Sequence, residues 1–119
     1  MSDYEEIDPA GLQRLNRMGG SPFIRKMIDL FLDEAPERLT AARSGEQAGD
    51  LVAVAAAAHA LKSSAQNFGA SRLSNIAEKI ELQARANTSE NLSTLLSDLE
   101  GAYGAAKAWL ESERDALNV

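Results

Sequence analysis

The chain has 119 residues, of which 45% are hydrophobic and 25% charged, so it is long enough to form one globular domain around its own core. It contains no cysteine, which excludes disulfides, a cysteine nucleophile and thiolate metal sites. Its formal charge of −6 is unfavourable for binding nucleic acids, and no apolar run reaches the roughly 20 residues that a transmembrane helix needs. Because residues 1–8 are acidic and lack the apolar stretch of a signal peptide, we expect a cytoplasmic protein.

The N-terminal part of the chain predicts an arm and a short helix. Residues 1–7 are interpreted as a flexible arm. Asp8-Pro9 has the pattern of an N-cap followed by proline in the first helical turn. A short helix is therefore expected to run to about Met18, where Gly19-Gly20 ends it.

A second helix is predicted to begin at Ser21-Pro22. Apolar residues then recur at spacings of three and four, which is typical of a helix with one buried face. They are Ile24, Met27, Ile28, Phe31, Ala35 and Leu39. Pro36 lies within this pattern and predicts a bend or an interruption near residues 32–35. A loop is expected around residues 45–49.

Asp50 is the predicted N-cap of a third helix, and Gly69 its end. Its expected core residues are Val54, Ala57, Leu61, Ser64 or Ala65, and Phe68. Ser71 can begin a fourth helix, with Leu73, Ile76, Ala77 and Ile80 facing inward.

The last predicted helix has the most regular pattern. Asn87 with Glu90 three residues later resembles a capping box at its start. The apolar residues that follow are Leu92, Leu95, Leu96, Leu99, Tyr103, Ala106 and Leu110. No segment alternates with a period of two, so no sheet is expected. The predicted fold is all-α: over residues 8–117, an antiparallel four-helix bundle with a short extra N-terminal helix.

His59 is the single histidine of the chain. On a helical wheel, the expected core residues of its helix fall on the half opposite to it, so His59 is predicted on the outer face, in mid-helix. Taken alone, this position also suits an ordinary solvated histidine. A metal site would need carboxylate partners at fixed spacing.

The residues around His59 resemble the signature of the histidine-containing phosphotransfer (HPt) domains of two-component phosphorelays. The segment His59-Ala60-Leu61-Lys62-Ser63-Ser64, followed by Gly69-Ala70, carries this resemblance. Residues 31–39 and 73–81 are similar to neighbouring helices of that family, and the resemblance covers roughly residues 8–110. The family usually has glycine where Ser63 stands, and often cysteine where Ala77 stands.

The resemblance implies that His59 accepts a phosphoryl group. An imidazole suits this chemistry because it is a nucleophile that is largely neutral at cell pH. Lys62 lies one helical turn away, and its ammonium can stabilise the phosphoryl oxygens. Glu81 is at a family position near the histidine, where it would either orient the ring or form an ion pair with Lys62. Gln66 is assigned the same supporting role.

A partner is expected to dock around the histidine. The wheel places small or apolar residues there, and the predicted docking set is Val52, Ala55, Ala56, Ser63 and Gly69. The alternative is that this patch packs under the short N-terminal helix at residues 9–18.

The sequence lacks a phosphate-binding glycine loop and anything like a kinase magnesium site, so it predicts a phosphoryl carrier and not an enzyme. The resemblance implies response-regulator receiver domains or a hybrid histidine kinase as partners, with magnesium on the receiver and no cofactor or metal of its own. No nucleic-acid or membrane partner is expected, and a monomer is predicted. Two alternatives remain: a non-phosphorylated receiver- or kinase-binding module, and the phosphorylatable domain of a chemotaxis-type kinase.

Overall fold

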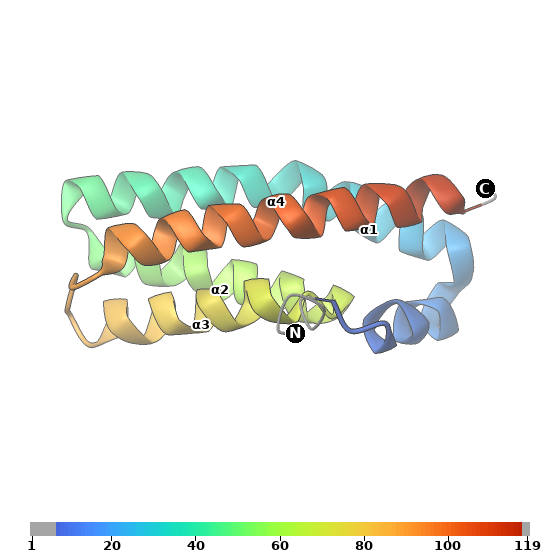
Figure 1. Ribbon diagram of the computed structural model, residues 1–119, viewed down its shortest axis with the longest axis horizontal. Coiled ribbons are helices and arrows are strands. Elements are labelled where there is room, and N and C mark those ends of the chain that lie inside the picture. Colours follow the sequence, from blue (N-terminus) through green and yellow to red (C-terminus); the bar gives the residue numbers. More distant parts are fainter. Residues whose placement is uncertain (1–6, 118–119) are drawn as a thin grey trace.

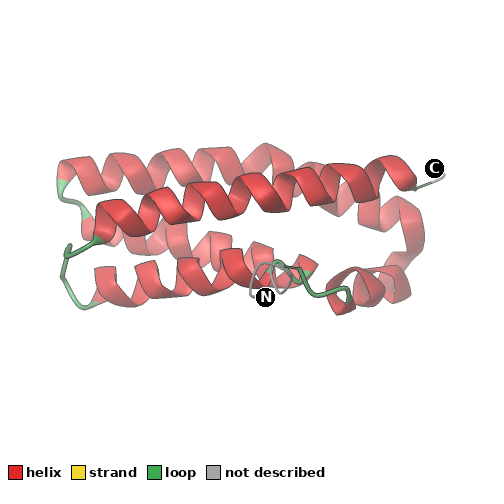
Figure 2. Ribbon diagram, viewed as in Figure 1, coloured by secondary structure: helices red, strands yellow, loops and turns green. Residues whose placement is uncertain are grey.

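A computed structural model, which describes residues 7–117, shows an antiparallel bundle of four helices (Figures 1 and 2). Their bounds are α1 Ala10–Ala48, α2 Leu51–Phe68, α3 Ser71–Arg85 and α4 Leu92–Ala116. Helix α2 packs against α1 and α3, and α4 packs against the same two helices, which closes the bundle. Residues 7–117 contain no strand. The predicted fold class is confirmed.

Helix α1 consists of two segments that meet at Gly20. This glycine has φ 73° and ψ −168°, a conformation that favours glycine, and it is the non-helical point within α1. Figure 1 shows the segment before Gly20 folded back across one end of the bundle, while the longer segment runs along α4. The two segments of α1 therefore correspond to the short first helix and the second helix that the sequence predicts.

Of two expectations for the later part of α1, one is wrong and one is wrong in part. Pro36 does not interrupt the helix: the non-helical φ and ψ within α1 are those of Gly20, and core residues on both sides of the proline, Ala35 and Ala42, are buried on one face. The loop expected over residues 45–49 is helical as far as Ala48. Gly45 packs closely against α2, where a Cβ atom would lie 3.0 Å from Cγ2 of Val54.

Both ends of α2 lie where the sequence predicts them. Gly49 ends α1 in the left-handed conformation, and the Asp50 side chain then accepts a hydrogen bond from the N–H of Ala53 at 3.1 Å. Gly69 ends α2 with φ 72°. The N-cap and the C-terminal glycine predicted for this helix are confirmed.

The predicted capping box at Asn87 is wrong. Asn87 adopts the left-handed conformation with φ 60°, and its N–H donates to the carbonyl of Ala84. It therefore ends α3, as asparagine can in place of glycine. Helix α4 begins at Leu92, after Asn91, and no side chain caps it.

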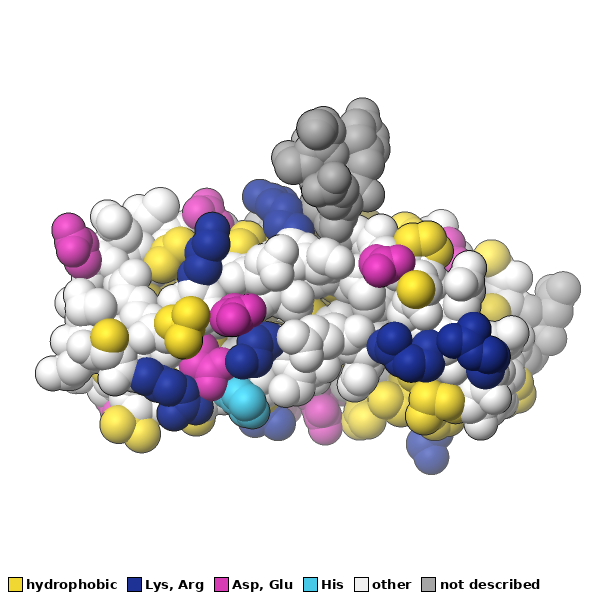
Figure 3. Space-filling view, turned by 90° about the horizontal axis from the view of Figure 1, so that it is seen from below, with side chains coloured by type: hydrophobic (Ala, Val, Ile, Leu, Met, Phe, Trp, Pro, Cys, Tyr) yellow, Lys and Arg dark blue, Asp and Glu magenta, His cyan; other side chains and the backbone are white. Residues whose placement is uncertain are grey.

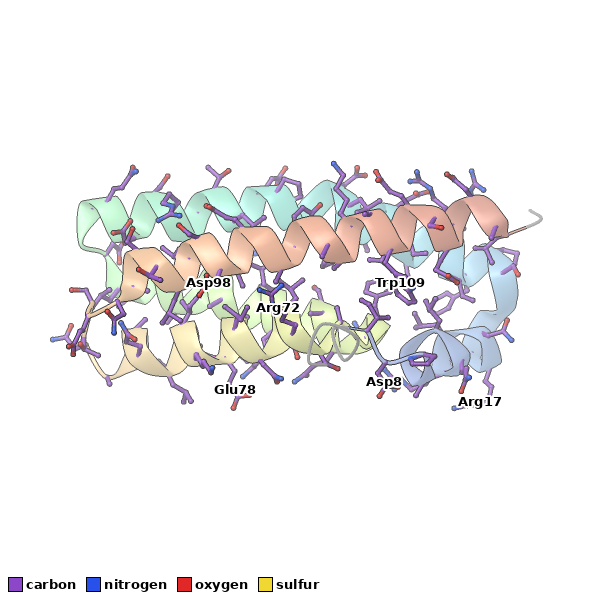
Figure 4. All side chains as sticks on the ribbon, viewed as in Figure 1. Asp8, Arg17, Arg72, Glu78, Asp98 and Trp109 are labelled. Atoms are coloured by element: carbon purple, nitrogen blue, oxygen red, sulfur yellow. The ribbon has the colours of Figure 1, made fainter. Side chains whose placement is uncertain are left out.

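The core is formed by one face of each helix. Its largest fully buried side chains are Phe68, Ile28, Leu61, Leu73, Ile80, Leu92, Leu96, Leu99, Leu110 and Val54. The rings of Phe31, Phe68 and Tyr103 pack together, with centroid distances of 5.3 Å and 5.8 Å from Phe31. Half-buried Trp109 extends this core toward the end that the first segment of α1 covers (Figure 4).

The predicted N-terminal arm lies outside the described residues except for Ile7, which is half-buried against the core. Within residues 7–117, no helix has the length and apolar content that crossing a membrane requires.

Candidate functional site

His59 lies on the exposed side of α2, near the middle of the helix. Its side chain is 56% exposed. Figure 3 shows it in cyan at the surface, beside acidic and basic side chains. The neighbouring Ala57 and Ala58 are buried in the core. The predicted outward position of the histidine is confirmed.

Glu81 reaches His59 from the adjacent helix. Its Oε2 atom lies 3.0 Å from Nδ1 of His59, and the glutamate is only 6% exposed. The ammonium of Lys62, with smaller contributions from Arg85 and His59, outweighs burial and lowers the pKa of the Glu81 carboxyl to about 2. The carboxylate is therefore ionised at neutral pH and only accepts hydrogen bonds, so Nδ1 of His59 carries the proton and donates it. In the neutral ring, the free lone pair then belongs to Nε2.

Lys62 forms an ion pair with the same carboxylate. Its Nζ atom lies 2.7 Å from Oε1 of Glu81, and its side chain is 22% exposed. Lysine and histidine thus use the two different oxygens of one carboxylate. The sequence left open whether Glu81 orients the ring or pairs with Lys62, and the structure shows both contacts at once.

Arg85 is a site residue that the sequence analysis missed. Its Nε and Nη2 atoms lie 2.9 Å and 2.8 Å from Oε2 of Glu81, the oxygen that also faces His59. The guanidinium is more than half exposed. Two cations therefore contact the carboxylate that faces the imidazole. The spacing of Glu81 and Arg85, four residues apart on one helix, is the sequence signal that indicates this pair.

Gln66 is exposed on α2, and its backbone carbonyl accepts a hydrogen bond from Arg14 at 3.2 Å. It lies about 10 Å from His59 along the helix axis. No contact in the described part of the chain joins its side chain to the imidazole, so its expected orienting role has no structural support.

The predicted docking set divides into exposed and covered residues. Val52 is 82% exposed, and Ala56 and Ser63 are also exposed. The exposed position predicted for Ala55 is wrong: this residue is only 5% exposed. The wheel placed it near His59, but α3 packs along that side of α2 and covers it.

Gly69 is partly covered by the segment that precedes α1. The N–H of Asp8 donates to the carbonyl of Gly69, and a Cβ atom on this glycine would collide with the carbonyl of Asp8. A partner that uses Gly69 would therefore meet Asp8 at the same place.

The short N-terminal helix does not cover the exposed surface that contains Val52 and Ala56. It contacts the opposite end of α2, where Gly11 lies against the backbone of Phe68 and Arg14 donates to the carbonyls of Gln66 and Asn67. The alternative that this helix buries the patch is therefore wrong for Val52 and Ala56. Across residues 7–117, no group of three or more acidic, histidine or cysteine side chains is placed to hold a metal ion.

Comparisons with known proteins identify the family and the fold. The family model described as "Hpt domain" matches residues 26–109, well over half of the chain. The fold is similar to that in the crystal structure of histidine-containing phosphotransfer protein B (HptB) from Pseudomonas aeruginosa PAO1. The TM-score is 0.89 and the sequences are 24% identical, over 95% of this chain and 97% of that chain. No curated protein matches the chain by sequence.

Proposed function

The chain belongs to the Hpt domain family, and we propose that His59 accepts a phosphoryl group from a receiver-domain aspartate and passes it to a second receiver domain. The family supports a phosphotransfer role in a phosphorelay. The acceptor residue, the partners and the direction of transfer are the parts that we propose.

The observation that carries the proposal is the contact between Nδ1 of His59 and the ionised Glu81. It directs the lone pair to Nε2 on a ring that is more than half exposed. In the transfer step, this lone pair attacks the phosphorus of the aspartyl phosphate. The P–N bond forms as the P–O bond to the aspartate breaks, and the aspartate leaves as a carboxylate.

No proton needs to leave His59 in this step. The proton on Nδ1 remains, so the phosphorylated ring gains positive charge, and Glu81 supplies the opposite charge at 3.0 Å. Transfer to a second receiver is the reverse reaction at another aspartate. Glu81 is therefore proposed as the residue that orients the ring and balances its charge in both steps.

Lys62 and Arg85 are proposed to stabilise the phosphoryl oxygens. Both cations are held at Glu81, one on each side of its carboxylate. A phosphoryl group on Nε2 brings negative charge to a site that already contains two positive groups, which favours its arrival. The transfer step takes no proton from either cation, so their effect on it is electrostatic.

The chain is proposed as a carrier that relies on its partners for the rest of the chemistry. The magnesium ion that assists aspartyl-phosphate chemistry is assigned to the receiver domain. The exposed Val52, Ala56 and Ser63 are proposed to form the contact surface around His59. A small, transient interface fits a protein that must release one receiver before it binds the next.

The test is a transfer assay with purified phosphorylated receiver domains. The wild-type chain should gain acid-labile, base-stable phosphate, and His59→Gln should gain none while keeping its helical circular dichroism signal. Lys62 and Arg85 still contact Glu81 in this variant, so the fold should be retained. Label on His59→Gln would show that the acceptor assignment is wrong.

A further inference from the structure

We propose that the hydroxyl of Ser63 donates a hydrogen bond to the phosphoryl group carried by Nε2 of His59, and that this contact shifts the transfer equilibrium toward the phosphorylated chain. This inference rests on the proposed function, because that function places the phosphoryl group on His59. It assigns to the phosphoryl group a contact that Glu81 and the two cations beside it do not supply.

Ser63 lies one helical turn after His59 on α2, and both side chains are exposed. Residues four apart in a helix are neighbours on its surface, with about 5–6 Å between their Cβ atoms. Side chains of a helix lean toward its N-terminus, so the Ser63 hydroxyl extends over the turn that contains the histidine. The oxygens of a phosphoryl group extend beyond Nε2 by two further bonds, which brings them within reach of this hydroxyl.

Ser63 and Lys62 lie on opposite sides of the imidazole. On the helical wheel of α2, Lys62 falls about 60° to one side of His59 and Ser63 about 40° to the other. The Lys62 side faces α3, where the ammonium contacts Glu81. Ala55, on that same side, is only 5% exposed, whereas Ser63 is exposed. The side of the phosphoryl group that faces away from α3 is therefore the side that Ser63 reaches.

The Ser63 hydroxyl is available for this bond. A serine within a helix often donates to the carbonyl one turn earlier, but within residues 7–117 the Ser63 hydroxyl has no hydrogen-bond partner. The hydroxyls of Ser71 and Ser74, by contrast, donate to backbone carbonyls. A hydroxyl proton rotates freely and can turn toward a phosphoryl oxygen. The family usually has glycine at position 63, and glycine cannot make this contact.

The equilibrium constant of transfer separates this contact from a docking role. A residue that only touches the receiver within the complex changes the forward and reverse rates by the same factor, because the separated proteins are unaffected. A hydrogen bond present only in the phosphorylated chain stabilises that state alone, so it shifts the equilibrium. For a bond to a charged group that competes with water, we expect an effect of about fivefold.

Three variants test the contact. Ser63→Ala removes the hydroxyl and keeps a good helix former, whereas Ser63→Thr retains a hydroxyl. Ser112→Ala makes the same change at an exposed position of α4 and is the control. Melting temperatures establish that all three variants fold.

The readout is the plateau ratio of phosphorylated chain to phosphorylated receiver, approached from both sides. One mixture starts with phosphorylated receiver and unmodified chain, and the other starts with phosphorylated chain and unmodified receiver. We expect Ser63→Ala to lower the equilibrium constant about fivefold. Ser63→Thr and Ser112→Ala should stay within about twofold of the wild type, since both keep a hydroxyl at position 63.

An unchanged equilibrium constant in Ser63→Ala, whatever its rates, would overturn this inference and leave the proposed function intact. Equal shifts in Ser63→Ala and Ser63→Thr would show that the hydroxyl is not the cause and would also overturn it. Phosphoramidate is a small donor that needs no docking: its P–N bond breaks, ammonia leaves and the phosphoryl group joins His59. If phosphoramidate labels His59 but no receiver does, the proposed function fails, and this inference fails with it.

Discussion

Nδ1 of His59 and Oε2 of Glu81 lie 3.0 Å apart, although the two residues are 22 positions apart in the sequence and belong to different helices. The antiparallel packing of α2 and α3 creates this contact. It assigns the ring proton to Nδ1 and the lone pair to Nε2, and it ties the nucleophile to Lys62 and Arg85 through one carboxylate. Most of the predictions below concern this contact.

Glu81→Gln should slow phosphoryl transfer by about tenfold. The neutral amide can donate or accept a hydrogen bond, so it no longer selects the Nδ1–H form of the ring, and it supplies no charge to the phosphorylated imidazole. Transfer rates from a phosphorylated receiver measure the effect. The control is Glu78→Gln, an exposed glutamate one turn earlier on α3 (Figure 4). Equal rates for the two variants would contradict the role given to Glu81.

The difference in unfolding free energy between the wild type and Glu81→Gln should depend on pH. Lys62, with help from Arg85 and His59, lowers the pKa of the Glu81 carboxyl from 4.5 to about 2 in the folded chain. The folded state therefore gains stability that is fully present above about pH 4.5 and is lost as the pH falls toward 2. Urea unfolding should show the free-energy advantage of the wild type over Glu81→Gln shrinking across this range. A constant difference from pH 6 to pH 2.5 would refute the prediction.

Lys62→Ala should slow phosphorylation of His59 by roughly five- to tenfold without changing the helical signal, because a partly exposed charge contributes about 1 kcal/mol. Lys79→Ala on the exposed side of α3 is the matched loss of charge. Rapid-quench transfer assays distinguish the two. Wild-type rates in Lys62→Ala would remove the lysine from the mechanism.

Ala56→Glu and Ala55→Arg should behave differently, although their positions are adjacent. Ala56 is exposed, so Ala56→Glu should weaken receiver binding while the melting temperature stays within a few degrees of the wild type. Ala55 is 5% exposed against α3, so Ala55→Arg should lower the melting temperature by forcing a long charged side chain into a packed position. Thermal melts beside transfer assays measure both. An unchanged melting temperature for Ala55→Arg would show that this position is not packed as described.

Local patterns predicted most of the bundle. The apolar spacing of α4 and the Asp50 and Gly69 signals of α2 depend on neighbours within one or two turns, so they are visible in the sequence. The helical end of α1 was not predictable in this way. Gly45 stays helical because it packs against Val54 of another helix, and no local signal carries that contact.

In the candidate site too, features that depend on one helix were predictable, whereas features that depend on packing between helices were not. The position of His59 on an outer face follows from the wheel, but the width of the buried face of α2 does not. The packing of α3 against α2 sets the width of that buried face, and for this reason Ala55 is buried. Asn87 shows a second limit: asparagine suits both the start of a helix and the left-handed end of one, and only the fold selects between them.

The identity of the phosphorylated atom tests the central claim most directly. Because the chain has a single histidine, ¹⁵N labelling of the imidazole gives one pair of ring-nitrogen signals. When a phosphorylated receiver is added, coupling to phosphorus should appear at Nε2 while Nδ1 keeps its proton. Phosphorylation at Nδ1, or protein-bound phosphate that leaves both ring nitrogens unchanged, would contradict the assignment of His59 Nε2 as the acceptor held in place by Glu81.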